Sequence, residues 1–372
     1  MLSYLKKFDW ILVGSVLTLC ALSSLILFGV DAGQASNFFV KQVLFIALGI
    51  VALVALSFFD VRVFRNHSFL LLVLYVILLI LLVLVLVLGQ RIRGSFAWFR
   101  LGELNFEPVE LAKLVVILIL AKYFSRRHVE MYRIRHVIAS AVYIALPLAL
   151  VLLQPDLGSS FILIMIWLGI VILSGIKPRH LLIVLACGAL AASLAWVFAL
   201  KPYQQQRILT FLNPAKDPLG YSYNLIQSKI AIGSGGIFGK GLGHGTQGQL
   251  NFLPEKHTDF IFAVFAEEWG FLGVLFLTAA YLAFFWRLIK LIFASTNNFF
   301  RLFIAGFAIT VFSQVFINIG MNLGLLPITG VSLPFVSYGG SNLLINFVAL
   351  GIIQNIAVQN KTGAMKKIDQ EN

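Results

Sequence analysis

Asp259 is a carboxylate at the start of a long apolar run, a position where it could do chemistry. It follows Glu255-Lys-His257-Thr258 and stands directly before Phe260-Ile-Phe-Ala-Val264. A carboxylate there can cap a helix, because the first backbone N–H groups of a helix lack partners. It can equally act as a general base, since partial burial raises the pKa of an aspartate from about 3.9 toward neutrality. The residues alone leave both interpretations open.

Glu110 and Lys113 form a second candidate site, on an apolar stretch from 107 to 124. They are three residues apart, so their side chains meet on one helix face, and Pro108 suits the first turn of that helix. Lys113 would lie about 8 Å below the helix entrance at 1.5 Å per residue, where a charge costs about 3 kcal/mol. The pair is either a structural ion pair or part of a functional site. In both cases it must face protein or water.

A glycine-rich run extends from Gly233 to Gly248 and contains Lys240, with Arg207, Lys229 and Lys256 on either side of it. Glycines allow close approach of a ligand, and successive backbone N–H groups attract anions. The cations favour docking of an anionic group such as a lipid pyrophosphate. A flexible linker with solubilising lysines is the alternative.

Other polar side chains are expected to have structural roles. Asp156, in a short turn, favours a helix cap. Gln314, Asn318 and Asn322 recur every four residues, a spacing that is typical of hydrogen bonding between membrane helices. The segment Pro334-Phe-Val-Ser-Tyr-Gly-Gly-Ser341 predicts an outer turn or re-entrant segment before the last apolar run.

The elements that must position these residues are membrane helices. Of the 372 residues, 60% are hydrophobic and only 12% are charged, too apolar a balance for a soluble domain. A spanning helix needs about 20 apolar residues. We therefore predict an all-α integral membrane protein, a single polytopic domain over 1–372, with a long structured outer loop at about 200–258 between spans 7 and 8. About ten spans are expected, at 10–30, 40–59, 69–89, 107–124, 137–153, 159–174, 181–199, 259–286, 301–324 and 340–357.

The distribution of basic residues predicts the orientation. The segments on the side of the N-terminus carry 17 of the 28 Lys and Arg residues, whereas the short loops of the other side carry four. By the positive-inside rule both termini are cytoplasmic and Asp259 faces outside. The net charge of +13 therefore indicates membrane topology and not a nucleic-acid partner. The two cysteines, Cys20 and Cys187, lie in apolar runs and predict neither a disulfide framework nor a zinc site.

The chain resembles the SEDS family (shape, elongation, division, sporulation) over essentially its whole length. The resemblance is carried by the stretch from Gln227-Ser-Lys-Ile-Ala-Ile-Gly to Phe252-Leu-Pro-Glu-Lys-His-Thr-Asp259, by Gln154-Pro-Asp-Leu-Gly158 and by Pro334 to Ser341. Gly-Lys240-Gly and Gly245-Thr-Gln are more similar to the RodA type than to FtsW. One departure is Glu107-Pro-Val-Glu110, where the family usually has Gln-Pro-Ser-Glu.

The resemblance implies a peptidoglycan glycosyltransferase of the bacterial inner membrane that acts in cell elongation and rod-shape maintenance. Its substrate would be lipid II, polymerised by inverting transfer with release of undecaprenyl diphosphate. The family's catalytic aspartate falls on Asp259, and its functionally important Glu and Lys fall on Glu110 and Lys113. The candidate substrate contacts besides these are Lys240, Lys229, Arg207 and His257.

Cofactors and partners follow from the same resemblance. No cofactor is certain, and a divalent cation, Mg²⁺ or Mn²⁺, is conceivable at the diphosphate although no ligand cluster is readable. The expected partners are a class B penicillin-binding protein and elongation-complex proteins such as MreC and MreD. The competing hypotheses are a lipid II flippase or transporter, and a non-catalytic scaffold of the cell-wall synthesis complex.

Overall fold

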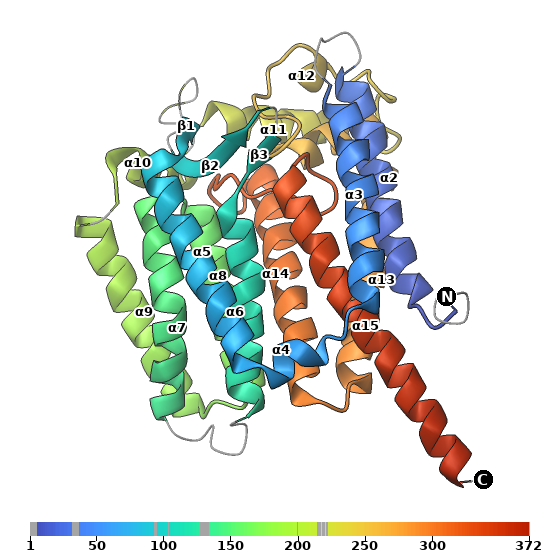
Figure 1. Cartoon of the computed structure of the whole chain (residues 1–372). Helices are drawn as coiled ribbons and strands as arrows, with labels where there is room; N and C mark the ends of the chain where they lie inside the picture. The colour runs from blue at the N-terminus through green and yellow to red at the C-terminus, as the bar shows by residue number, and fades with distance from the viewer. Residues whose placement is uncertain are drawn as a thin grey trace.

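The computed structural model describes residues 6–31, 37–92, 95–102, 104–126, 134–198, 200–213, 217, 220 and 222–371. Long helices lie side by side and run between two ends of a bundle (Figure 1). The cations Arg93, Arg127 and Arg133, which the charge count includes, lie outside the described residues. In the described part of the chain the long helices are α2 (Trp10–Asp31), α3 (Phe38–Phe58), α5 (Ser68–Leu88), α6 (Pro108–Ser125), α7 (Ile134–Leu153), α8 (Leu157–Leu173), α9 (Pro178–Phe198), α13 (Ile261–Ala294), α14 (Asn298–Leu323) and α15 (Gly340–Glu371).

These helices match the ten predicted spans, which confirms the all-α membrane fold. Eight of them are long and apolar enough to cross a bilayer. Of the other two, α8 is apolar but has only 17 residues, and α6 carries three charged side chains. Large apolar side chains cover the outer surface, as a bilayer requires. The protein is a multi-pass membrane protein.

The helices differ in how deeply they are buried. Nearly every side chain of α6 is buried, and α14 is buried along most of its length. In contrast, α9 has no buried residue and stands at the edge of the bundle in Figure 1. The charged α6 therefore lies inside protein, as predicted for a helix with intramembrane charges.

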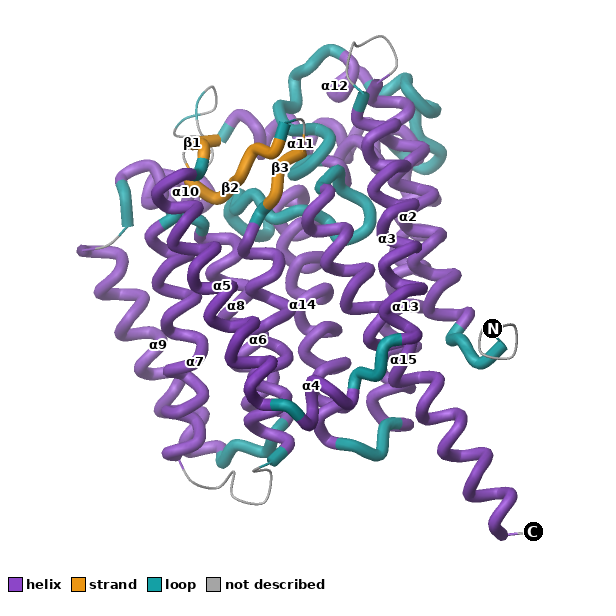
Figure 2. Tube along the Cα trace, in the orientation of Figure 1, coloured by secondary structure: helices purple, strands orange, loops and turns teal. Residues whose placement is uncertain are grey.

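One end of the bundle, here called the sheet end, carries short elements. Figure 2 shows the orange strands there, beside short helices. The helices lie within the long loop predicted at about 200–258 and confirm that it is structured. The sheet was not predicted. The elements are β1 (Gln90–Ile92), β2 (Ser95–Leu101) and β3 (Leu104–Phe106), paired antiparallel in the order β1-β2-β3, and α10 (Pro202–Leu212), α11 (Tyr223–Ser234) and α12 (Thr246–Gln249).

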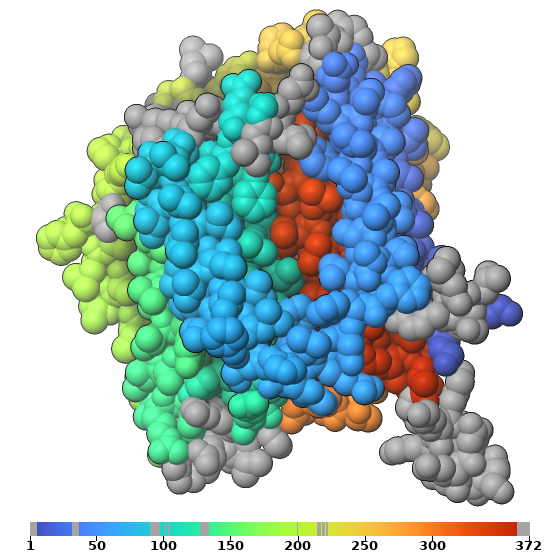
Figure 3. Space-filling model, viewed as in Figure 1, coloured from blue at the N-terminus to red at the C-terminus, as the bar shows by residue number. Residues whose placement is uncertain are grey.

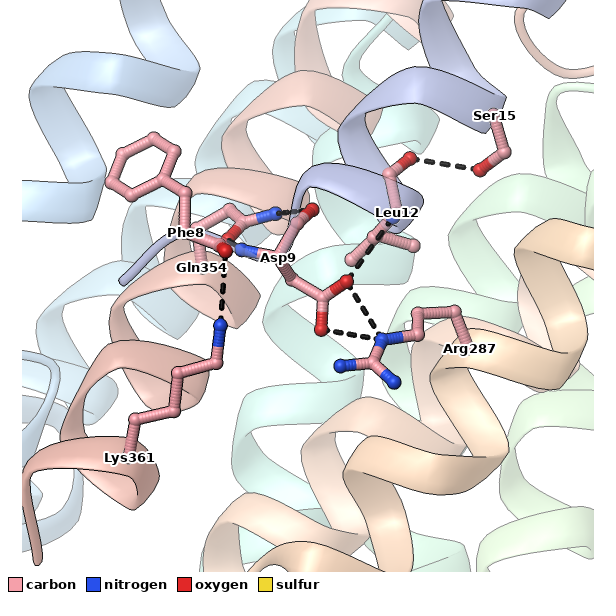
Figure 4. Close-up of polar contacts among 7 residues, drawn as sticks. All are labelled: Phe8, Asp9, Leu12, Ser15, Arg287, Gln354 and Lys361. Atoms are coloured by element: carbon pink, nitrogen blue, oxygen red, sulfur yellow. Dashed lines mark hydrogen bonds and ion pairs between the residues drawn. The ribbon is translucent and has the colours of Figure 1, made fainter. Parts of the chain in front are cut away.

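The opposite end, here called the α4 end, carries α4 (Arg62–Asn66), also not predicted, and the turn between α13 and α14. On this half of the bundle an ion pair joins the start of α2 to α13. The Arg287 Nε donates to both carboxylate oxygens of Asp9, at 2.7 and 2.6 Å (Figure 4). Gln354 of α15 bonds the backbone of Asp9, and Lys361 donates to the Phe8 carbonyl. Three helices distant in sequence are thereby joined.

Candidate active site

A pocket of about 80 Å³ lies beside the sheet and is lined by several charged side chains. Its walls come from β2, α6, α8, α14, the start of α15 and the turns before α13 and α15. The charged residues that line it are Glu107, Glu110, Lys113, Asp156 and Asp259. Four carboxylates therefore share this pocket with a single ammonium group among its lining residues.

Asp259 is positioned through its backbone. Its carbonyl oxygen accepts hydrogen bonds from the side-chain amides of Asn318 and Asn322, at 3.1 and 3.0 Å, both from α14. Its amide donates to the Glu255 carbonyl at 3.1 Å. The N-cap position of α13 is Phe260, whose side chain cannot accept a hydrogen bond. The N-cap position of α13 is thus occupied by Phe260 and not by Asp259, and Asn318 and Asn322 of the predicted polar stripe hold the Asp259 backbone.

The segment between α14 and α15 covers Asp259. The Ser337 hydroxyl donates to the Thr258 carbonyl at 2.6 Å, and the Tyr338 amide donates to the His257 carbonyl at 2.9 Å. Gly330 has φ of +76° and comes so close that an added Cβ would lie 3.6 Å from Asp259 Oδ2. A glycine suits both the positive φ and the space left for a ligand at the carboxylate. The irregular segment predicted before the last span is confirmed.

Glu110 and Lys113 are joined as predicted, with 2.7 Å between Lys113 Nζ and Glu110 Oε1. Their side chains are 8% and 4% exposed. The second oxygen, Glu110 Oε2, accepts from the amide of Asn342 at 3.0 Å, and Asn346 in turn donates to Asn342. The first turns of α15 therefore fix the Glu110 carboxylate, and Glu110 fixes the ammonium group of Lys113.

Glu107 and Asp156 complete the acidic wall. Asp156 caps α8 as predicted, because its Oδ1 accepts from the Ser159 amide at 3.0 Å. Glu107 lies just before α6, where its amide donates to the Ser341 hydroxyl. Burial raises the pKa of the Glu107 carboxyl well above its usual range, and the nearby Glu110, Asp156 and Asp259 carboxylates raise it further, opposed by Lys113.

The other four predicted contact residues do not line this pocket. Lys240 pairs with Glu267 at 2.7 Å, and Lys229 lies against Gly324 at the end of α14. Arg207 stacks over the Tyr203 ring of its own helix. His257 stacks on Phe38, with 4.1 Å between ring centroids, and so lies beside the pocket rather than in its wall.

The glycine-rich run packs against protein, at a break in α13. Gly270 interrupts that helix with φ of +64°, and an added Cβ would lie 2.3 Å from the Gly239 amide nitrogen. Glu267, to which the sequence assigned no role, accepts from Lys240, from the Thr246 hydroxyl and from the Gln247 amide. The close approach that these glycines permit is therefore to α13.

Among the lining residues that the sequence did not identify as part of a site are Trp98, Asn342 and Gln314. Trp98 belongs to the unpredicted sheet, and Asn342 gave no periodic signal. Gln314 was assigned to helix contacts, yet it lines the pocket, and its buried Oε1 has no hydrogen-bond partner among the described residues. An unpaired buried acceptor is costly, so this oxygen is suited to a donor from a ligand.

Comparison with known proteins identifies the family. The profile of the cell cycle proteins FtsW, RodA and SpoVE matches residues 5–362. The chain belongs to the FtsW/RodA/SpoVE family. Relatives of this family include the peptidoglycan glycosyltransferase MrdB of Escherichia coli K12, which is 39% identical over 93% of this chain and 92% of its own length. A probable peptidoglycan glycosyltransferase FtsW of Coxiella burnetii is 35% identical over 93% of both chains.

Solved structures of family members have the same fold. The rod shape determining protein RodA of Thermus thermophilus is 33% identical and superposes with a TM-score of 0.71 over 94% of this chain and 96% of its own. A chain from a peptidoglycan synthase complex, solved to show how polymerisation and crosslinking are coordinated, is 35% identical with a TM-score of 0.80, over 95% and 98%. The chain is a FtsW/RodA/SpoVE-family peptidoglycan glycosyltransferase.

Proposed function

We propose that this glycosyltransferase polymerises lipid II, with Asp259 as the general base. The observation that carries the proposal is the shared pocket, in which Asp259 and the Glu110–Lys113 pair lie together at the end of membrane-crossing helices. The GlcNAc 4-hydroxyl of the incoming lipid II attacks the anomeric carbon of the growing strand. Its proton passes to Asp259, the bond to the diphosphate breaks with inversion, and the electron pair leaves with undecaprenyl diphosphate.

Lys113 has the complementary role of stabilising the leaving group. A diphosphate leaves readily and needs cationic stabilisation more than a proton. Glu110 and Asn342 orient the ammonium group, and the Gln314 oxygen is available to a substrate hydroxyl. Lys240 and Lys229 are engaged with Glu267 and with the end of α14, so we assign them no contact with the reacting atoms.

The pocket accommodates the reacting groups and not the whole substrate. Its volume of about 80 Å³ is well below the 300–1,000 Å³ usual for ligand pockets. The sugars must therefore lie above it, beneath the sheet-end loops. Figure 3 shows red residues of the C-terminal segment at the surface between the blue and cyan N-terminal helices. We propose that the polyprenyl tail reaches the site from this side, through the bilayer.

We further propose the orientation and the partner. The excess of Lys and Arg at the α4 end supports an orientation in which that end and both termini face the cytoplasm of a bacterial inner membrane and the pocket lies on the outer face. The match to a chain of a peptidoglycan synthase complex supports an assembly with a class B penicillin-binding protein, which would cross-link the strands. MreC and MreD would be further members of an elongation complex.

The described residues hold no group of three or more His, Cys, Asp or Glu side chains arranged to bind a metal ion. The four carboxylates line one pocket but do not form a ligand set. Mg²⁺ bound mainly by the substrate's own phosphates is the arrangement that such a site permits. We therefore derive no catalytic step through a metal ion.

The proposal is tested by polymer formation from purified lipid II in detergent, with and without the cognate penicillin-binding protein. We expect Asp259→Asn to lower the rate by about 100- to 10,000-fold, the usual contribution of a general base. Asp60→Asn, at an exposed carboxylate of the α4 end, is the control and should polymerise normally. Near-normal polymerisation by Asp259→Asn would refute the base assignment. Absence of polymer from the wild type with its partner bound would favour a flippase or a scaffold.

A further inference from the structure

A second cavity, of about 410 Å³, lies at the α4 end, away from Asp259. It is formed where the end of α4, the end of α6 and the turn before α14 meet. The residues that line it are Arg65, Asn66, Lys122, Ser125, Arg126, Thr296, Asn297 and Asn298. Three of these are cations, five are neutral hydrogen-bonding residues, and none of these described lining residues is acidic.

Two of the three cations, Lys122 and Arg65, are held by side-chain hydrogen bonds. Lys122 is buried, and its ammonium group donates to the Arg65 carbonyl at the end of α4. Arg65 donates to the Asn66 side chain, and Arg126 is the C-cap residue of α6. Among the described lining residues these three positive charges have no carboxylate to offset them, so they repel one another and an anion in the cavity would relieve that repulsion.

An apolar groove of about 420 Å³ joins this cavity, because Lys122 and Arg126 line both. The groove runs between α5 and the α6–α7 pair, past Leu72, Tyr75 and Ile119. The Tyr75 hydroxyl donates to the Tyr143 carbonyl at 2.7 Å and links α5 to α7 there. Phe69, 76% exposed, and Leu72, 56% exposed, open the groove toward the bilayer. A ligand with a charged head and an apolar tail fits this pair of sites.

We propose that the cavity and the groove bind one phosphatidylglycerol-type phospholipid, with its phosphate on Arg65, Lys122 and Arg126 and an acyl chain in the groove. Basic pockets between membrane helices bind anionic lipid headgroups in this way. The amides of Asn66, Asn297 and Asn298 are suited to the hydroxyls of a glycerol headgroup. An ethanolamine headgroup would bring its own ammonium group among the three cations. A bare polyprenyl phosphate has no headgroup hydroxyls for these side chains to contact.

The test is lipid binding by the delipidated full-length protein, measured by native mass spectrometry and by thermal unfolding. Dioleoylphosphatidylglycerol should bind and raise the Tm, and dioleoylphosphatidylethanolamine should not. In Arg65→Gln/Arg126→Gln the apparent Kd for phosphatidylglycerol should rise about 10- to 30-fold, as expected for two basic residues. Arg301→Gln, an exposed site on the first turn of α14 outside the cavity, should match the wild type.

Two further arms separate the possible ligands. Leu72→Trp, which narrows the groove and leaves the cations in place, should weaken phosphatidylglycerol binding. If the double variant does not fold, Arg126→Gln alone, at the end of α6, serves in its place. Equal binding of the two phospholipids, equal weakening by Arg301→Gln, or tighter binding of undecaprenyl phosphate would each overturn the proposal. If inorganic phosphate alone raised the Tm as much as phosphatidylglycerol does, the assignment of an acyl chain to the groove would be wrong.

Discussion

Lys113 and Glu110 neutralise each other inside the protein, and the proposed mechanism uses only one of the two charges directly. Burying either charge alone is unfavourable, because the protein interior solvates a charge much less well than water does. Removing one partner therefore leaves the other charge buried without its ion-pair partner. Stability therefore depends on both charges, whereas the proposed chemistry uses one of them directly. Substitutions can separate the structural role from the catalytic one.

We predict that Glu110→Gln and Lys113→Met each cost about 3–5 kcal/mol of stability, the usual cost of breaking a buried ion pair. The double variant should be more stable than either single variant, since neither member of the pair is then left buried without the other. The double variant should still polymerise lipid II at least about 100-fold more slowly than the wild type, because the cation at the diphosphate is lost. Unfolding in detergent and lipid II polymerisation measure the two effects. A double variant with wild-type polymerisation would show that Lys113 is structural only.

Glu107 yields a pH-dependent prediction. Its raised pKa means that the folded protein holds this proton more tightly than the unfolded chain does. The stability contribution is therefore complete at low pH and declines as the pH rises from the ordinary glutamate value toward the folded-state pKa. Glu107→Gln, which mimics the protonated form, should equal the wild type near pH 4 and melt about 2 °C or more above it at pH 8.

The control for Glu107→Gln is Asp60→Asn, at an exposed carboxylate of the α4 end. The difference in Tm between Asp60→Asn and the wild type should not increase with pH. Thermal unfolding between pH 4 and 8 in one detergent is sufficient for the comparison. A constant difference between Glu107→Gln and the wild type at every pH would contradict the assignment of a raised pKa.

The helices could be predicted because each apolar run is long and bounded by charge or turn residues. The sheet at 90–106 could not, since its strands have three, seven and three residues and stand between spans. Asp259, Glu110 and Lys113 were identified because charge in an apolar run is costly. Gln314 and Asn342, which line the same pocket, were not identified as site residues. They come from α14 and α15, and no local sequence pattern shows that these helices pack beside Asp259. The same limit applies to Lys240, whose partner Glu267 is 27 residues away.

The contacts in Figure 4 join helices whose order in sequence does not predict their contact. Asp9 is 1% exposed and accepts from Arg287 of α13, while its backbone bonds Gln354 of α15. Asp9→Asn keeps the shape and removes the charge. We expect a loss of about 1–3 kcal/mol, the value of a charged hydrogen bond. Polymerisation at a temperature where the variant is folded should be unchanged, because the site lies at the other end.

Unfolding by denaturant in detergent measures the Asp9→Asn effect. Arg62→Gln is the matched control, because Arg62 also bonds α15 through Gln359 but is exposed. It should cost less than about 1 kcal/mol. A loss of polymerisation by folded Asp9→Asn, at wild-type substrate affinity, would contradict a purely structural role.

The bundle has chemically distinct ends, and the proposed function fixes which of them faces the cytoplasm. The sheet end holds the acidic pocket with Asp259, and the α4 end holds the basic cavity. On the basis of the positive-inside rule we propose that the α4 end faces the cytoplasm. The substrate would therefore be used on the outer face, and the proposed phospholipid would come from the inner leaflet.

This orientation is tested with single cysteines in a chain whose Cys20 and Cys187 are replaced by alanine. Leu250→Cys, at an exposed position of the sheet end, should react with a membrane-impermeant maleimide in intact spheroplasts. Asn66→Cys, exposed at the α4 end, should react only after the membrane is permeabilised. Both variants must polymerise lipid II, which shows that each is folded. Labelling of Asn66→Cys in intact spheroplasts would invert the topology and place Asp259 where no extracellular strand could be made.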